Sequence, residues 1–168
     1  MAKQVLIPLG LVIVFIIAVG LFIQKYPSYN ATFKKDSEVQ EVKQKTVTIG
    51  AKKIDVEIAN TPVLRQKGLS NRSSLAENSG MLFVFDSKPV AEKFWMKDML
   101  IPIDIIWIRN NKVSEIYKNV PFYPKGIPDN QLKIYSPKDP ADYVLEVNSG
   151  FSDKNNFKVG DSVILPNL

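Results

Sequence analysis

Few side chains in this sequence could do chemistry, because its 168 residues include no cysteine and no histidine. Thiol nucleophiles, imidazole bases, disulfides and the usual zinc or copper sites are therefore excluded. The remaining candidates gather in one apolar run, FWMKDMLIPIDIIWI, at residues 94–108. This run keeps three charged side chains, Lys97, Asp98 and Asp104, and the question is what they do there.

Asp104 is the strongest single candidate for a residue with a special role, because the strand around it is apolar on both faces. A carboxylate buried there costs several kcal/mol unless it is paired or hydrogen-bonded. The cations available are Arg65, Arg72 and Lys97, and we expect Arg65 or Lys97 to hold Asp104. The alternative is a carboxylate that accepts backbone N–H groups after Pro102. A structural role is favoured over a functional one, since structural networks also hold buried carboxylates.

Two other chemistries would use the same run. Asp98 and Asp104 could form the carboxylate pair of a glycosidase, which needs separations of about 5–5.5 Å or 6.5–9.5 Å that spacing alone does not show. Trp95 could stack on a sugar or another flat ligand, although large aromatic residues more often fill a core. The candidate ligand-binding residues are Arg65, Arg72, Trp95, Lys97, Asp98 and Asp104.

No metal or cofactor is expected. Asp153-x-Asn155 begins like a calcium loop, but the glycine at the sixth position and the glutamate at the twelfth are missing. The sequence also lacks a glycine-rich phosphate loop and a Gly-x-Ser-x-Gly elbow.

Short elements must position these residues. Alternation of apolar and polar residues predicts a hairpin at 46–59 that turns at Gly50-Ala51. Thr61-Pro62 predicts the start of a helix that ends near Gly68. Further strands are predicted at 80–86, 94–97, 103–108, 112–120, 142–147 and 162–165, with a long loop at 121–140 and a helical turn at 149–156. Pro102 separates two of these strands, and Asn110-Asn111 closes a hairpin.

Many short strands with one or two short helices predict a mainly-β domain at residues 46–168, an antiparallel sandwich or a barrel-like sheet. The run at 94–108 is too short and too broken by charges and proline to span a bilayer. It is therefore expected to be core or site.

A different segment is expected to cross the membrane. Residues 5–23, VLIPLGLVIVFIIAVGLFI, carry no charge, and as a helix they would span roughly 28 Å, close to the hydrocarbon thickness of about 30 Å. A cleaved signal peptide is the alternative, but its apolar region would be shorter and followed by a small-residue cleavage site. We expect a retained single-pass anchor after a tail at 1–4, with a polar tether at 24–45.

The charges around this anchor determine its orientation only weakly. The positive-inside rule alone favours a cytoplasmic domain, whereas a short tail before a long folded domain is typical of a signal-anchor that exports the domain. We expect the extracytoplasmic face, with the lipid bilayer as partner. The net charge of +5 comes from 22 basic and 17 acidic residues, but only three are arginines and the lysines are scattered, so nucleic-acid binding is not expected.

Several spaced motifs occur together in a fixed order: Arg65-x-x-Gly68-Leu69, Arg72, Gly80-Met81-Leu82-Phe83-x-Phe85, Phe94-Trp95-Met96-Lys97, Leu100-Ile101-Pro102-Ile103-Asp104-Ile105 and Val159-Gly160-Asp161. In these motifs residues 46–168 resemble the DUF192 family. The resemblance implies a compact, mainly-β domain, often behind an N-terminal hydrophobic segment, and it implies no activity. The family usually has Asn-Thr after Trp-Met-Lys, where this chain has Asp98-Met99.

The sequence therefore predicts a membrane-anchored binding or accessory module. Its ligand is expected to be a small polar molecule, a glycan or a partner protein. Two alternatives stay open: a hydrolase that uses Asp98 or Asp104 as acid or base, and a protein-interaction domain that uses an open sheet edge.

Overall fold

The computed structural model of the protein describes residues 45–168. Their elements, in chain order, are strands β1 (Lys45–Ile49) and β2 (Lys52–Ala59), helix α3 (Pro62–Lys67), strands β3 (Ser79–Val84), β4 (Phe94–Trp95), β5 (Ile103–Arg109) and β6 (Lys112–Val120), the 3-10 turn η1 (Asp129–Gln131), strands β7 (Ile134–Tyr135) and β8 (Tyr143–Asn148), helix α4 (Phe151–Lys154) and strand β9 (Val163–Ile164). The prediction of a mainly-β domain with two short helices is confirmed.

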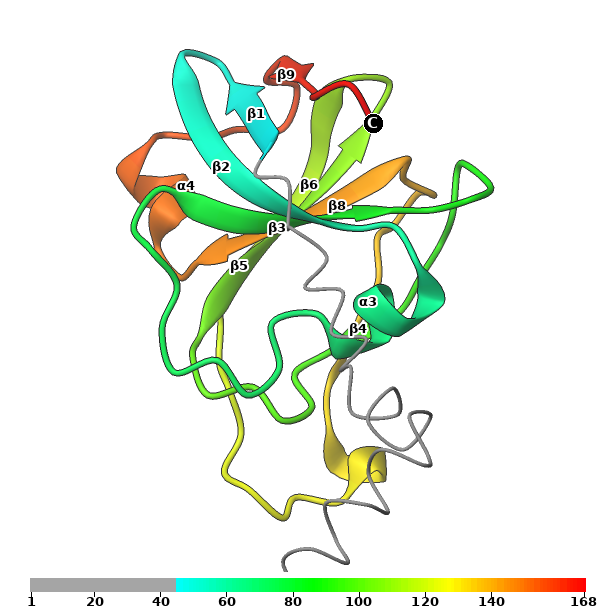
Figure 1. Cartoon of the computed structure of the whole chain (residues 1–168), viewed down its shortest axis with the longest axis vertical. Helices are drawn as coiled ribbons and strands as arrows, with labels where there is room; N and C mark the ends of the chain where they lie inside the picture. The colour runs from blue at the N-terminus through cyan, green and yellow to red at the C-terminus, as the bar shows by residue number, and fades with distance from the viewer. Residues whose placement is uncertain (1–44) are drawn as a thin grey trace, which may run out of the picture. The chain divides into compact units, whose positions relative to one another are not determined.

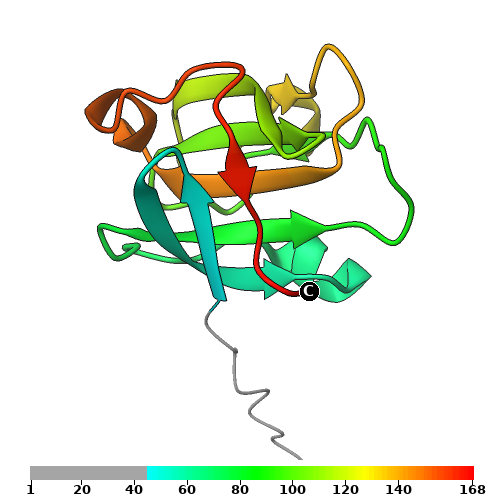
Figure 2. The ribbon, with the colours of Figure 1, turned by 90° about the horizontal axis from the view of Figure 1, so that it is seen from above.

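Seven strands form one sheet in the order β6-β5-β8-β3-β2-β1-β9. The sheet curls until its two edge strands approach each other, and a bridge between Lys112 and Ser162 joins them at one end (Figures 1 and 2). The sheet is therefore a nearly closed barrel, which is the second of the two predicted architectures. One pair of strands departs from antiparallel pairing, because β2 and β3 are parallel. Parallel neighbours need a crossover, which α3 and residues 68–78 supply.

The predicted tight turns are present. Gly50 has φ of 58° in the two-residue turn between β1 and β2. Asn110 and Asn111 have φ of 50° and 56° between β5 and β6, the positive values that a type I′ hairpin turn requires.

The central strands are apolar on both faces because each face packs against a different core. One face lines the barrel interior, which is filled by side chains from the sheet, from α4 and from the residues after α4: Val47, Ile49, Ile54, Val56, Leu82, Ile106, Ile108, Val113, Leu145, Val147, Phe151, Phe157 and Val163. The other face of β3, β5 and β8 carries a second cluster that includes Met81, Phe83, Met96, Ile103, Ile105, Trp107, Tyr135 and Val144. We call this second cluster the outer core.

Three excursions between strands cover the outer core: residues 60–78 with α3, residues 85–102 with β4, and residues 121–142. The last was predicted as a plain loop, but it contains η1 and β7. Strand β7 pairs with β4 in a separate two-stranded sheet, with Phe94 opposite Tyr135 and Trp95 opposite Ile134. The strand at β4 is also shorter than the predicted 94–97.

Within residues 45–168, no helix is long and apolar enough to serve as a membrane span. The predicted anchor at 5–23 lies outside the described residues, as does the predicted tether except for Lys45, which begins β1.

Candidate functional site

A cavity of about 340 Å³ opens between α3, the strand β4 and the outer face of the sheet. Its lining comes from α3 and the turn after it, from β3 and the residue after it, from residues 92–95, from Met99 and from β8: Pro62, Arg65, Gln66, Lys67, Gly68, Leu69, Ser70, Phe83, Phe85, Glu92, Lys93, Phe94, Trp95, Met99 and Glu146. The volume is at the small end of the range of ligand pockets.

The sequence around α3 explains the position of the side of the cavity that this helix and the turn after it form. Thr61 caps the helix, its Oγ1 accepting a hydrogen bond from the Leu64 N–H at 3.2 Å, and Pro62 occupies the first helical position. Gly68 ends the helix with φ of 49°. A Cβ at Gly68 would meet the Phe83 ring at an ordinary contact distance of 3.4 Å, so the positive φ, rather than the space, is what favours glycine here.

Phe94 fixes the opposite wall. Its ring meets Phe83 edge to face at 4.9 Å between centroids and meets Trp107 in the same way at 5.3 Å. Such pairs add about 0.5–1.5 kcal/mol beyond their buried area. The packing holds β4 over the outer core and leaves Trp95, next along the chain, 45% exposed beside the cavity.

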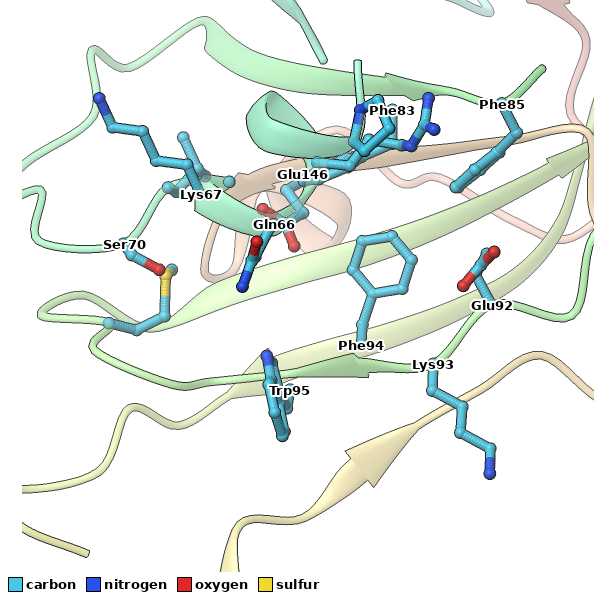
Figure 3. A pocket seen from close by; sticks show the side chains of 15 residues that line it. Gln66, Lys67, Ser70, Phe83, Phe85, Glu92, Lys93, Phe94, Trp95 and Glu146 are labelled. Carbon is cyan, nitrogen blue, oxygen red and sulfur yellow. The ribbon is translucent and has the colours of Figure 1, made fainter. Parts of the chain in front are cut away.

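Glu146 supplies the one acidic group that is buried in this lining. Leu145 and Val147 on β8 point into the barrel, so alternation sends Glu146 to the outer face, where it is 6% exposed. Within residues 45–168, no side chain or backbone N–H donates a hydrogen bond to its carboxyl group. Burial raises the pKa of Glu146 from its ordinary value of 4.5 to about 8. Figure 3 shows this carboxyl group near Gln66, between α3 and the Phe94 ring.

The cations of the lining do not neutralise Glu146. Arg65 Nη1 donates to the carbonyls of Asn60 at 3.0 Å and Val84 at 2.8 Å, and Nη2 pairs with Asp86 at 3.1 Å. Its guanidinium also lies over the Phe85 ring, 5.6 Å from the centroid. Arg65 therefore links α3 to the end of β3, and none of these hydrogen bonds reaches Glu146.

Of the six predicted site residues, the structure brings Arg65 and Trp95 to the cavity, and the other four do not line it. Arg72 makes a two-armed ion pair with Glu57, which raises the pKa of Arg72 and lowers the pKa of Glu57. Lys97 pairs with Asp129 at 2.6 Å on the surface. Asp98 stands in a turn with φ of 55°, where its carbonyl accepts the Asn71 N–H.

The fourth, Asp104, is fully buried, and the expectation that Arg65 or Lys97 holds it is wrong. Oδ1 accepts the N–H of Asn119 at 2.8 Å and of Gly150 at 3.1 Å, and Oδ2 accepts the N–H of Ser152 at 2.8 Å. The alternative prediction, that backbone N–H groups donate to Asp104, is therefore confirmed. The donors come from β6 and the start of α4 rather than from the residues after Pro102.

Sequence reasoning missed Glu146. Its signal was the same one that singled out Asp104, namely an acid inside a strand whose neighbours are apolar. The described residues contain no group of three or more carboxylates, cysteines or histidines that could hold a metal ion.

Comparison with known proteins agrees with the fold. The family model DUF192, described as "Uncharacterized ACR", matches residues 44–165. The chain belongs to the DUF192 family. No curated protein matches the sequence.

Several solved structures resemble this DUF192 domain. A protein of unknown function from Novosphingobium aromaticivorans is 29% identical with a TM-score of 0.62, over 71% of this chain and 83% of that one. A "putative transcription regulator" from Sinorhizobium meliloti is 26% identical with a TM-score of 0.64, over 73% of this chain and 93% of that one.

Proposed function

We propose that this DUF192 protein is a membrane-anchored binding module whose domain takes a small ligand in the cavity between α3 and β4. Glu146 carries the proposal. A carboxyl group buried without a partner costs several kcal/mol, and an apolar residue would pack the outer core at no such cost. A buried carboxyl group that faces a cavity with aromatic walls is the usual composition of a ligand site.

The lining also suits a small ligand with both apolar and polar groups. Phe83, Phe85, Phe94 and Trp95 offer ring surfaces, and the Gln66 amide offers hydrogen bonds. The Ser70 hydroxyl donates to the Lys97 carbonyl at 3.0 Å and can still accept a hydrogen bond. A sugar of a glycan is one such ligand, since its rings stack on aromatic faces.

A fragment screen by NMR tests the binding proposal. The full-length chain is kept in a mild detergent, and fragments of positive, negative and zero charge are added to ¹⁵N-labelled protein. We expect shift changes at the amides of 65–70 and 92–95 and at the Trp95 indole N–H. Fragments that bind only elsewhere, or none that bind, would refute the proposal.

The anchor part of the proposal rests on the uncharged run at 5–23. We expect the mature protein to stay in the membrane fraction after a carbonate wash, with the domain accessible to protease from the extracytoplasmic side. A soluble mature chain that begins after Ile23 would show that the segment is a cleaved signal peptide.

A further inference from the structure

The charges around Glu146 leave its carboxyl group without a counter-ion. The charged residues that line the same cavity are Arg65 and Lys67 on α3, and Glu92 and Lys93 ahead of β4. Arg65 is committed to Asp86 and two carbonyls. Lys67 lies close enough to Glu57 to lower the pKa of that group. Figure 3 shows the Lys67 and Lys93 side chains running away from Glu146.

Both lysines are exposed, so water and salt screen them, whereas Glu146 lies in a medium of low dielectric constant. Consistent with this, burial alone raises the pKa of Glu146, and no neighbouring cation offsets it. A positively charged ligand group that entered the cavity could therefore pair with this carboxylate without displacing a cation of the described domain.

The walls favour the same kind of ligand group. The faces of aromatic rings attract cations. The chain itself already uses two of the lining rings in this way: the Arg65 guanidinium lies over Phe85, and the Lys97 ammonium lies 5.6 Å from the centroid of Trp95. The inner rings Phe83 and Phe94 have no such cation among the described residues.

Resting on the proposed function, we propose that the cavity selects small molecules that carry an ammonium or guanidinium group, which pairs with the Glu146 carboxylate between the aromatic walls. The proton balance follows from the chemistry. Below about pH 8 the free protein holds a proton on Glu146. Binding of the cation releases that proton to solvent. The Glu146 carboxylate then carries one negative charge, which pairs with the positive charge of the ligand.

A matched pair of probes tests this inference: benzylguanidinium, which stays charged across the pH range, and benzylurea, its neutral analogue of the same shape. The affinity of the full-length chain for each is measured by NMR titration from pH 6 to pH 9. We expect the affinity for benzylguanidinium to rise by up to about tenfold per pH unit and to level off above pH 8. Calorimetry in buffers of different ionisation heat should show close to one proton released per ligand at pH 6.5.

Two variants separate a specific pairing from general charge attraction. Glu146→Gln should lose the rise in affinity with pH and bind benzylguanidinium at least tenfold more weakly at pH 8.5. Glu77→Gln removes an exposed charge that pairs with Lys154 and should bind as the wild type does. The proton-release measurement uses the wild-type chain alone, so it decides the matter even if Glu146→Gln does not fold.

The inference is overturned if benzylurea binds as tightly as benzylguanidinium at pH 8.5, or if the affinity for benzylguanidinium falls as the pH passes 8. In either case a probe still binds in the cavity, so the proposed binding function would stand. If no fragment of any charge binds in the cavity, the proposed function fails as well.

Discussion

Two buried acids in this domain illustrate two ways of keeping a carboxyl group out of water. Asp104 is satisfied by three backbone N–H groups, whereas Glu146 has an aromatic cavity in front of it and no donor within the described residues. The first arrangement gives both carboxyl oxygens hydrogen-bond donors, whereas burial in the second raises the pKa of Glu146 and favours its neutral form. Only the second leaves the group free for a ligand.

Glu146 should make the protein less stable as the pH rises. Between about pH 4.5 and 8 the unfolded chain has lost this proton while the folded chain still holds it. The unfolded state therefore binds fewer protons, and the free energy of unfolding should fall across this window by about 3–5 kcal/mol. Urea melts of the wild type and Glu146→Gln at pH 5, 6.5, 8 and 9 measure it. The variant should lack this fall, and parallel pH profiles for the two proteins would contradict the prediction.

Asp104→Asn should destabilise the domain even though no cation is left unpaired. The amide nitrogen of asparagine would replace one carboxylate oxygen, so either the Ser152 N–H or the pair from Asn119 and Gly150 would face a donor. We expect a loss of about 2–4 kcal/mol in denaturant melts. Asp98→Asn, at a position where asparagine tolerates the positive φ, is the control and should stay within about 0.5 kcal/mol. Equal stabilities for the two variants would count against the backbone-capping role.

At the scale of elements, the cavity depends on how closely β3 and β8 approach each other behind it. Gly80 on β3 pairs with Val147 on β8, and it has no side chain to hold the strands apart. A Cβ at this glycine would lie 2.5 Å from the Glu146 carbonyl oxygen and 3.0 Å from a methyl group of Val147. Only a shift of backbone could relieve the first contact.

Gly80→Ala should therefore cost about 1–3 kcal/mol of stability and also move Glu146. Ser79→Ala, one residue earlier on the same strand, adds no atom and serves as the control. Chemical denaturation measures the cost, and the pH dependence of stability reports on Glu146. If Gly80→Ala melts like the control, the close approach of β3 and β8 is not tight in solution.

The limits of sequence reasoning appear at this scale too. The hairpins at Gly50 and Asn110-Asn111, the helix from Pro62 and the strands around Pro102 were predictable, because turn residues, caps and alternation are local signals. The parallel pairing of β2 and β3 and the pairing of β4 with β7 were not, because they join segments far apart in the chain. For the same reason the sequence singled out Arg65 and Trp95, which line the cavity, but not Glu146, which faces a cavity only because α3 and β4 lie in front of it.

At the scale of the whole molecule, the described domain carries its own barrel interior and its own outer core. The contacts of residues 45–168 lie within one compact unit. We therefore expect residues 45–168, produced without the segment before them, to unfold in one cooperative step. Coincident denaturation curves from tryptophan fluorescence and far-UV circular dichroism would show it. Two separate transitions would mean that the excursions over the outer face fold independently of the barrel.

The placement of the cavity outside the barrel has a consequence for how DUF192 proteins can diverge. Most of its lining belongs to excursions that join strands, and the barrel interior contributes no side chain to it. Exchange of residues 85–102 for the corresponding segment of a relative would alter what enters without repacking the interior. Under the proposed binding function, two members of the family could therefore share one barrel and recognise different molecules through different segments between the strands.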